Sequence, residues 1–353
     1  MARRRIFWHI GPDDVGAAWI GTALDASRAA LAEAGVHVAG TAPERERVTA
    51  ELRGTAHDLG LRCRDVEGAS ARLVHELWKH RGTTIVSLPG LAGATPEQVA
   101  MAMDGTRGAE HHVVLVERDL TSQLYAGAQA SLERGTSTRA DQYVARALEE
   151  ADGVGDLPGI LGRWTRLVFP ENVHVVAEAS PDLIWKRLVG LLGADLPLPE
   201  GAVRSDLGPS QLTVLREVVI GLEGRLSEAE RRTTLRDWLS RAVLARQPGG
   251  GFDRLPGALD DSLRARAAEW TDFCHREGYD VQGTLRTDRE DGGRRPISSQ
   301  ESASAALAEA LVEVARLREQ NADLEARNEH LDKKRRKHKT RAKKLAERLD
   351  DHR

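Results

Sequence analysis

Hydrophobic residues follow two different patterns along the chain. Short apolar runs rich in β-branched residues predict buried strands, and apolar residues spaced three or four apart predict helices that cover a core. The predicted strands are residues 6–8, 36–38 (a short or edge strand), 83–88, 111–116 and 172–176. The predicted helices are residues 19–34, 43–59, 69–80, 121–133, 138–151, 160–167 and 181–192. Because strands and helices alternate, we expect an α/β fold with a parallel β-sheet flanked by helices.

Single residues give more specific predictions for two helices. Thr95 is predicted to cap a helix, with Pro96 in its first position and Gln98 in its first turn. In the helix over residues 69–80, Trp78 is predicted to face inward with two leucines. Both are statements about local geometry that a structure tests directly.

The pattern changes after residue 192 and again after residue 286. Residues 193–286 predict helices and loops only, whereas the next segment is charged, rich in glycine and poor in apolar residues, as flexible linkers are. We therefore divide the chain as follows: an α/β core over residues 1–192, a helical extension of that domain over 193–286, a flexible linker over 287–300 and a C-terminal coiled coil over 301–353.

The C-terminal segment carries a heptad repeat. The predicted a positions are Leu307, Val314, Asn321, Asn328, Arg335, Ala342 and Leu349, and the d positions are Ala303, Ala310, Leu317, Leu324, Leu331, His338 and Leu345. Leucine at most d positions predicts a coiled coil, and asparagine at two successive a positions favours a parallel dimer in fixed register. We expect a homodimer through residues 301–331.

A basic stretch follows the predicted dimer seam. Nine of the twelve residues from Lys333 to Lys344 are Lys or Arg, so like charges should loosen the pairing after Leu331. Such a stretch attracts the phosphates of nucleic acid or anionic lipid, which makes an anionic partner one alternative. A solvated basic helix is the other.

Composition and charge restrict the class of protein. The chain has 353 residues and a net charge of −3, with 14 Lys and Arg against 11 Asp and Glu in residues 301–353 and 37 against 43 in the rest. The acidic body does not predict a nucleic-acid surface. Cys63 and Cys274 lack partners at metal-ligand spacing and are expected to be buried, so we assign neither a metal nor a disulfide. No stretch approaches the ~20 apolar residues of a membrane span, and we expect a cytoplasmic protein.

The first predicted strand leads into a loop bounded by Gly11 and Gly16, and a helix follows. This layout is typical of phosphate-binding sites, because the first turn of a helix presents free N–H groups and a positive dipole end. A P-loop adds a lysine and a Ser or Thr hydroxyl at the helix start. Here Asp14, Ala17 and Ala18 occupy the loop and the start of the helix.

The order of these parts resembles the bacterial sulfotransferase family, whose fold is P-loop-like, over roughly residues 4–285. In that family the opening reads approximately His-hydrophobic-Gly-Leu-Pro-Lys-Thr-Gly-Thr-Thr. The matching segments here are His9-Ile10-Gly11-Pro12-Asp13-Asp14-Val15-Gly16-Ala17-Ala18, Gly90-Leu91-Ala92, Arg118-Asp119-Leu120, Arg163-Trp164, Asp182-Leu183-Ile184-Trp185-Lys186-Arg187 and Gly278-Tyr279-Asp280-Val281.

The resemblance implies the cofactor 3′-phosphoadenosine 5′-phosphosulfate (PAPS), bound through the first loop and through an arginine after the strand over residues 111–116. Three positions match the family: Gly11, Gly16 and Arg118. The family's catalytic Lys and its two Thr correspond to Asp14, Ala17 and Ala18, its Ser to Ala126, and its His-Glu pair to Leu88 and Pro89. No catalytic residue is assigned.

A carboxylate at Asp14, where the family has a cation, repels an anionic cofactor, so PAPS binding is expected to be weak or absent. We expect a sulfotransferase-like binding or scaffold homologue. One alternative is a divergent sulfotransferase that acts on a carbohydrate or small hydroxylated acceptor, with Lys79, His80 or Arg204 pointing into the cleft. The other is a nucleic-acid or membrane-surface adaptor that works through the basic tail.

Overall fold

The structure is a computed structural model of the chain. It describes residues 4–11, 15–117, 119–149, 156–178, 180–202, 207–222, 224–247, 257–285 and 298–310, and separate positions between 312 and 335. The chain divides into two compact units, Met1–Ser302 and Ala303–Arg353. Each is described by itself.

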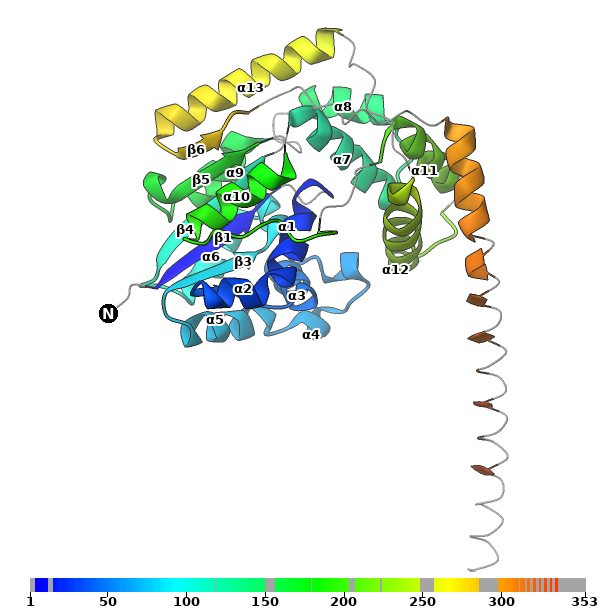
Figure 1. Cartoon of the computed structure of the whole chain (residues 1–353), viewed down its shortest axis with the longest axis horizontal. Coiled ribbons are helices and arrows are strands. Elements are labelled where there is room, and N and C mark those ends of the chain that lie inside the picture. Colours follow the sequence, from blue (N-terminus) through cyan, green and yellow to red (C-terminus); the bar gives the residue numbers. More distant parts are fainter. Residues whose placement is uncertain are drawn as a thin grey trace, which may run out of the picture. The chain divides into compact units, whose positions relative to one another are not determined.

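The first unit is built on a parallel β-sheet with six strands among its described residues, in the order β2-β3-β1-β4-β5-β6 (Figure 1). The strands are β1 Arg5–Ile10, β2 Val36–Val38, β3 Thr83–Ser87, β4 Glu110–Glu117, β5 Val173–Ala177 and β6 Asp280–Gly283. All five neighbouring pairs run parallel. The predicted α/β fold with a parallel sheet is confirmed.

Helices cover both faces of the sheet, because successive strand residues point to opposite sides. In β1, Ile6, Trp8 and Ile10 belong to one core and Phe7 to the other. The core containing Phe7 is covered by α1 Val15–Ala26, α2 Arg28–Glu33 and α10 Pro181–Leu191. The opposite core is covered by α3 Ala42–Arg53, α5 Ala69–Lys79, α6 Pro96–Asp104, α7 Leu120–Glu133, α8 Ala140–Glu149, α9 Leu157–Trp164 and α13 Gly257–Glu277.

The remaining helices among the described residues are α4 Cys63–Val66, α11 Pro209–Leu222, α12 Glu228–Arg231 and η4 Arg232–Val243, which is π-helical. The 3₁₀ turns are η1 Ala56–Leu59, η2 Pro89–Gly93, η3 Pro170–Asn172 and η5 Leu244–Arg246.

The predicted helix start at Thr95 is confirmed. The Thr95 hydroxyl accepts the Gln98 amide at 3.3 Å, and the Gln98 side chain accepts the Thr95 amide at 3.0 Å. This reciprocal pair is a capping box, which satisfies two of the amides left free at a helix start. Pro96 occupies the first position of α6.

Four other predictions are wrong. The single helix over residues 19–34 is two helices that meet at Ser27. β6 lies in the region predicted to hold helices and loops only, because it is a short, partly exposed edge strand without an apolar run. Trp78 is 41% exposed, with its indole N–H bonded to the Gly105 carbonyl at 2.6 Å, and Cys63 is exposed. Cys274 is buried as expected.

A helix begins near the end of the first unit, at residue 299. Ser298 precedes it and bonds Glu301 through its backbone amide and its hydroxyl, both at 2.9 Å. Ser302 donates its hydroxyl to the Gln247 side chain at 2.6 Å, which fixes the start of this helix on the first unit. The described positions of the second unit are helical.

Candidate functional site

The order of the strands places a topological switch point at the carboxyl edge of the sheet, between β1 and β4. We call the space outside this point the crevice. From β1 the chain passes towards β2 on one side, and from β4 it passes towards β5 on the other. β1 and β4 are neighbours, with Ile10 paired to Leu115. Open α/β sheets bind ligands at such a topological switch point, outside the carboxyl ends of the strands. The residues that follow β1 and β4 are therefore the structural candidates for a site.

The predicted strand–loop–helix is present at this point. β1 ends at Ile10, Gly11 follows, and α1 begins at Val15, so the backbone of Gly16, Ala17 and Ala18 lies in the first turns of a helix. The Gly11 amide donates to the Pro89 carbonyl at 3.4 Å, which holds the loop beside the end of β3. Asp14 and Arg118, the charged members of the predicted site, lie outside the described residues.

His9, the last residue but one of β1, is fully buried. Its Nδ1 lies 2.8 Å from the Ser87 hydroxyl at the end of β3, and its Nε2 has no hydrogen-bond partner among the described residues. Burial, assisted by the charge of Arg45, lowers the pKa of His9 to about 3. The imidazole is therefore neutral at neutral pH and supplies no positive charge to an anion.

Arg45 on α3 is the cation that acts on His9, and its guanidinium is already engaged. Nη2 lies 2.6 Å and Nη1 3.0 Å from the two carboxylate oxygens of Asp25 on α1, and Nη1 also donates to the Gly40 carbonyl at 2.7 Å. Burial alone would raise the pKa of Asp25, but the hydrogen bonds and charges of Arg45 and Arg28 outweigh it and hold the pKa below its usual value. The charge of Arg45 is thus neutralised internally.

The described polar residues at the end of β4 and directly after it also interact with other residues of the fold. Asp119 caps α7 by accepting the Ser122 amide at 2.8 Å. Glu117 is buried, and its charge adds to burial in raising the pKa of Cys274 to about 12. Cys274 therefore stays a thiol and is not a nucleophile at neutral pH. Ala126, at the position of the family's serine, is buried in α7.

Lys79 and His80 do not reach the crevice. Lys79 ends α5 and His80 follows it, at the amino-terminal edge of the sheet, where Arg4 donates to the His80 carbonyl at 2.9 Å. The His80 ring stacks on His37 with centroids 3.4 Å apart. Two of the three side chains named for the enzyme alternative therefore do not support it. The third, Arg204, lies outside the described residues.

A chain of polar side chains crosses β4, β5 and β6 near the amino-terminal edge, and sequence reasoning missed it. His112 Nδ1 lies 3.0 Å from His174 Nε2, and His174 Nδ1 lies 2.7 Å from Asp280 Oδ2. Burial, with the charge of His174, lowers the pKa of His112 to about 4. His111 instead contacts the Trp8 indole N–H at 3.0 Å. The only signal for this chain of side chains in the sequence is a histidine near the start of β4 and another near the start of β5.

The described residues show neither a metal-binding cluster nor a membrane-spanning helix. No group of three or more His, Cys, Asp and Glu side chains in the described part of the chain is arranged to hold a metal ion. Among the helices so described, none is both long and apolar enough to cross a membrane. Of the basic stretch, Lys334 and Arg335 belong to the described positions, and both are exposed.

The structure defines an α/β protein with a parallel sheet, in which Gly11 follows β1 at the switch point and α1 begins at Val15. Comparison with known proteins finds no matching family model, no matching curated protein and no matching solved structure. The sulfotransferase resemblance remains a prediction from the sequence.

Proposed function

We propose that this chain is a sulfotransferase-like binding protein that has lost most of the chemistry needed for sulfuryl transfer. The observation that carries the proposal is the state of the charged groups beside the end of β1. Arg45 is held by Asp25, and His9 is buried with a pKa of about 3. Sulfuryl transfer needs positive charge at the leaving phosphosulfate and a base near the acceptor. Neither His9 nor Arg45 supplies these.

The sequence of the first loop supports the same proposal. Gly11 and Gly16 match the family's glycines, but a carboxylate at Asp14 takes the place of the family's lysine. Like charges ~5 Å apart repel by about 1 kcal/mol at an effective dielectric constant near that of water. The sequence thus keeps the glycines of an anion-binding motif but places a negative charge where an anion needs a positive one.

Calorimetric titration of the full chain with PAPS and with adenosine 3′,5′-bisphosphate tests the proposal. We expect no saturable binding below ~1 mM for the natural chain. Asp14→Lys turns ~1 kcal/mol of repulsion into a similar attraction, so affinity should rise about 30-fold or more. Asp13→Lys makes the same charge change one position away and is the matched control. A micromolar dissociation constant for the natural chain, or sulfuryl transfer to a sugar acceptor, would instead support the enzyme alternative.

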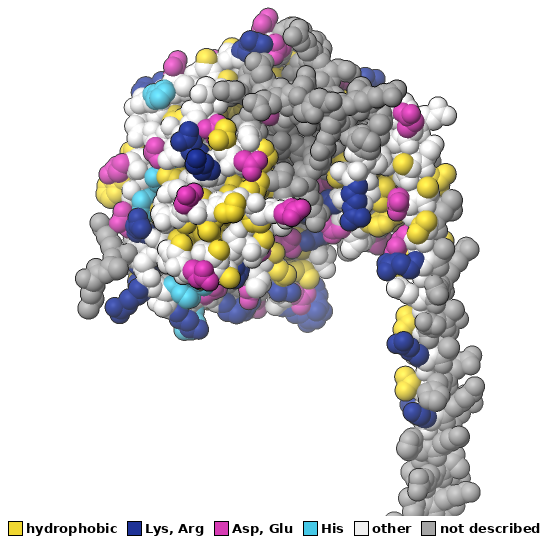
Figure 2. Space-filling model, in the orientation of Figure 1, with side chains coloured by type: hydrophobic (Ala, Val, Ile, Leu, Met, Phe, Trp, Pro, Cys, Tyr) yellow, Lys and Arg dark blue, Asp and Glu magenta, His cyan; other side chains and the backbone are white. Residues whose placement is uncertain are grey.

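We further propose that the tail joins two copies of the chain. Figure 2 shows hydrophobic side chains alternating with Lys and Arg along the described part of the tail. Leu317, Leu324 and Leu331, all at predicted d positions, are 46%, 54% and 60% exposed. Leucines repeated at this spacing on an exposed helix favour a partner helix with the same repeat.

The mass of the full chain in solution tests the dimer. Leu324→Asp places a charge in the predicted seam and should give a monomer at micromolar concentration. Val312→Asp is the matched control, because Val312 is also exposed, at 66%, but lies at a predicted outer position of the heptad. Light scattering should report a dimer for the natural chain and for Val312→Asp. A monomeric natural chain would refute the proposal.

A further inference from the structure

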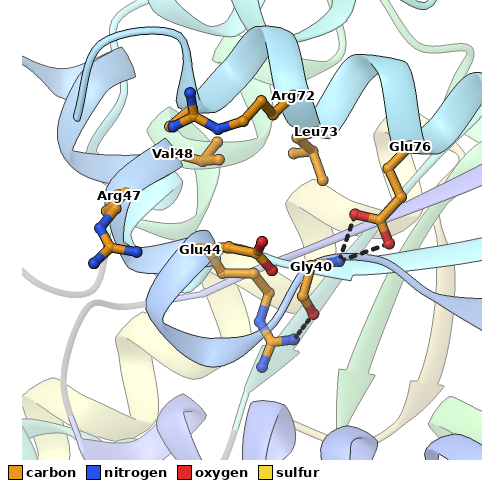
Figure 3. Close-up of a pocket in the computed structure, with 9 residues that line it drawn as sticks. Gly40, Glu44, Arg47, Val48, Arg72, Leu73 and Glu76 are labelled. Atoms are coloured by element: carbon orange, nitrogen blue, oxygen red, sulfur yellow. Dashed lines mark hydrogen bonds between the residues drawn. The ribbon is translucent and has the colours of Figure 1, made fainter. Parts of the chain in front are cut away.

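A second cavity lies away from the switch point, at the carboxyl end of β2. It measures about 160 Å³ and opens between α3 and α5 (Figure 3). The residues that line it are Gly40, Glu44, Arg45, Arg47, Val48, Ala69, Arg72, Leu73 and Glu76. Like the crevice beside β1, this cavity is at the edge of the sheet where ligands bind in open α/β folds.

The floor of the cavity is apolar. Val48 of α3 and Ala69 and Leu73 of α5 are 2%, 4% and 6% exposed and belong to the core on that face. A cavity of about 150 Å³ with apolar walls is large enough to hold benzene. The floor therefore suits a small hydrocarbon body.

The two carboxylates of the lining already accept hydrogen bonds from the protein. Glu44 accepts the Thr41 amide and hydroxyl, both at 2.7 Å. Glu76 accepts the Gly40 amide at 3.1 Å on each oxygen and His37 Nε2 at 2.9 Å. These bonds hold the pKa of both carboxyl groups below the usual value. Both bonds to Glu44 fall on Oε2, whereas both oxygens of Glu76 accept a bond, so Glu76 has less spare acceptor capacity than Glu44.

Two of the three arginines of the lining differ from the carboxylates in this respect, whereas Arg45 is held by Asp25. Arg47 donates no hydrogen bond to any residue that the structure describes, although its charge acts on Glu44. Arg72, whose charge acts on Glu51, donates a single long hydrogen bond to a described residue, from Nη1 to the Glu67 carbonyl at 3.3 Å. Each guanidinium carries five N–H donors, so donors remain in excess over acceptors around the cavity. Figure 3 shows both guanidinium groups on the side of Val48, away from Glu76.

We propose that this cavity binds a small organic monoanion, with its carboxylate on Arg47 and Arg72 and its hydrocarbon body on Val48, Ala69 and Leu73. Arg and carboxylate form strong, charge-assisted hydrogen bonds, and an apolar body gains from leaving water for the floor. The inference does not depend on the function proposed above, because Arg47 and Arg72 take no part in that proposal.

Three probes of similar size test the charge of the ligand. Calorimetry of the full chain is run with benzoate, benzyl alcohol and benzylamine, which differ in carrying a negative, a neutral or a positive group. We expect benzoate to bind at least about tenfold more tightly than the other two, as charge-assisted bonds predict. Stronger binding of benzylamine would overturn the proposal, because the carboxylates would then govern the site. Absence of saturable benzoate binding would also overturn it.

Substitution of the lining arginines tests whether benzoate binds in this cavity. Arg47→Gln and Arg72→Gln should each weaken benzoate binding about tenfold or more while leaving the melting temperature within a few degrees. Arg64→Gln is the matched control, since the Arg64 side chain is 67% exposed and lies outside the lining. Loss of affinity in all three variants alike would refute the assignment to this cavity. Retained affinity in Arg47→Gln and Arg72→Gln would refute it as well.

Discussion

Replacing His9 with asparagine should remove a large part of the acid sensitivity of the first unit. His9 is fully buried and has a pKa of about 3, whereas an unfolded histidine titrates near 6.5. As pH falls, the unfolded chain therefore binds the proton first, and the folded state loses stability. The contribution of His9 is complete above about pH 6.5 and declines as the pH is lowered towards 3.

The size of the effect follows from the two pKa values. One pKa unit corresponds to about 1.4 kcal/mol, so the full difference amounts to roughly 5 kcal/mol. Between pH 7 and pH 5, protonation of the unfolded chain costs about 2 kcal/mol of the free energy of unfolding. Asparagine can keep the contact to Ser87, because its amide occupies the place of Nδ1, and it does not titrate.

Urea unfolding followed by tryptophan fluorescence measures this difference. All seven tryptophans belong to the first unit, so the signal reports on that unit alone. From pH 7 to pH 5 the natural chain should lose about 2 kcal/mol more than His9→Asn does. His75→Asn replaces an exposed histidine and should behave like the natural chain. Equal losses in the natural chain and in His9→Asn would refute the assignment of a neutral, buried His9.

Two further substitutions test the architecture by the same urea assay. Asp25→Asn leaves the buried guanidinium of Arg45 without its anion, so the free energy of unfolding should fall by about 3 kcal/mol. A fall below ~0.5 kcal/mol would mean that Arg45 finds another partner. Gly283→Ala places a Cβ on a backbone with φ of +98° and against the Ala177 carbonyl, so the free energy of unfolding should fall by about 2 kcal/mol or more. Gly190→Ala is the control and should not destabilise the protein, because its Cβ would lie in open space on α10.

The features that the sequence predicts well are those that depend on residues close together along the chain. The capping box joins Thr95 to Gln98, three residues away, and the strands of the core are recognisable as apolar runs of β-branched residues. Such features depend on neighbours along the chain, so one sequence contains all their information. The same holds for the turn after β1, whose glycine and following helix were predicted together.

The polar pairs inside the fold could not be predicted in this way. Asp25 and Arg45 are 20 residues apart, His112 and His174 are 62 apart, and His174 and Asp280 are 106 apart. The first pair joins helices α1 and α3 and the other two join neighbouring strands, and which elements become neighbours is not encoded in any single segment. β6 was missed for a related reason: its pairing to β5, rather than an apolar run, makes it a strand.

The contacts between the ends of β1 and β3 need no cofactor. His9 contacts Ser87, the Leu88 amide donates to the His9 carbonyl at 2.9 Å, and the Gly11 amide donates to the Pro89 carbonyl. These contacts join the ends of β1 and β3 through the protein alone, so selection for folding is enough to keep them. Asp14→Lys is informative for this reason, because Asp14 takes part in none of the contacts named here and the substitution changes the charge that follows Gly11 in the sequence.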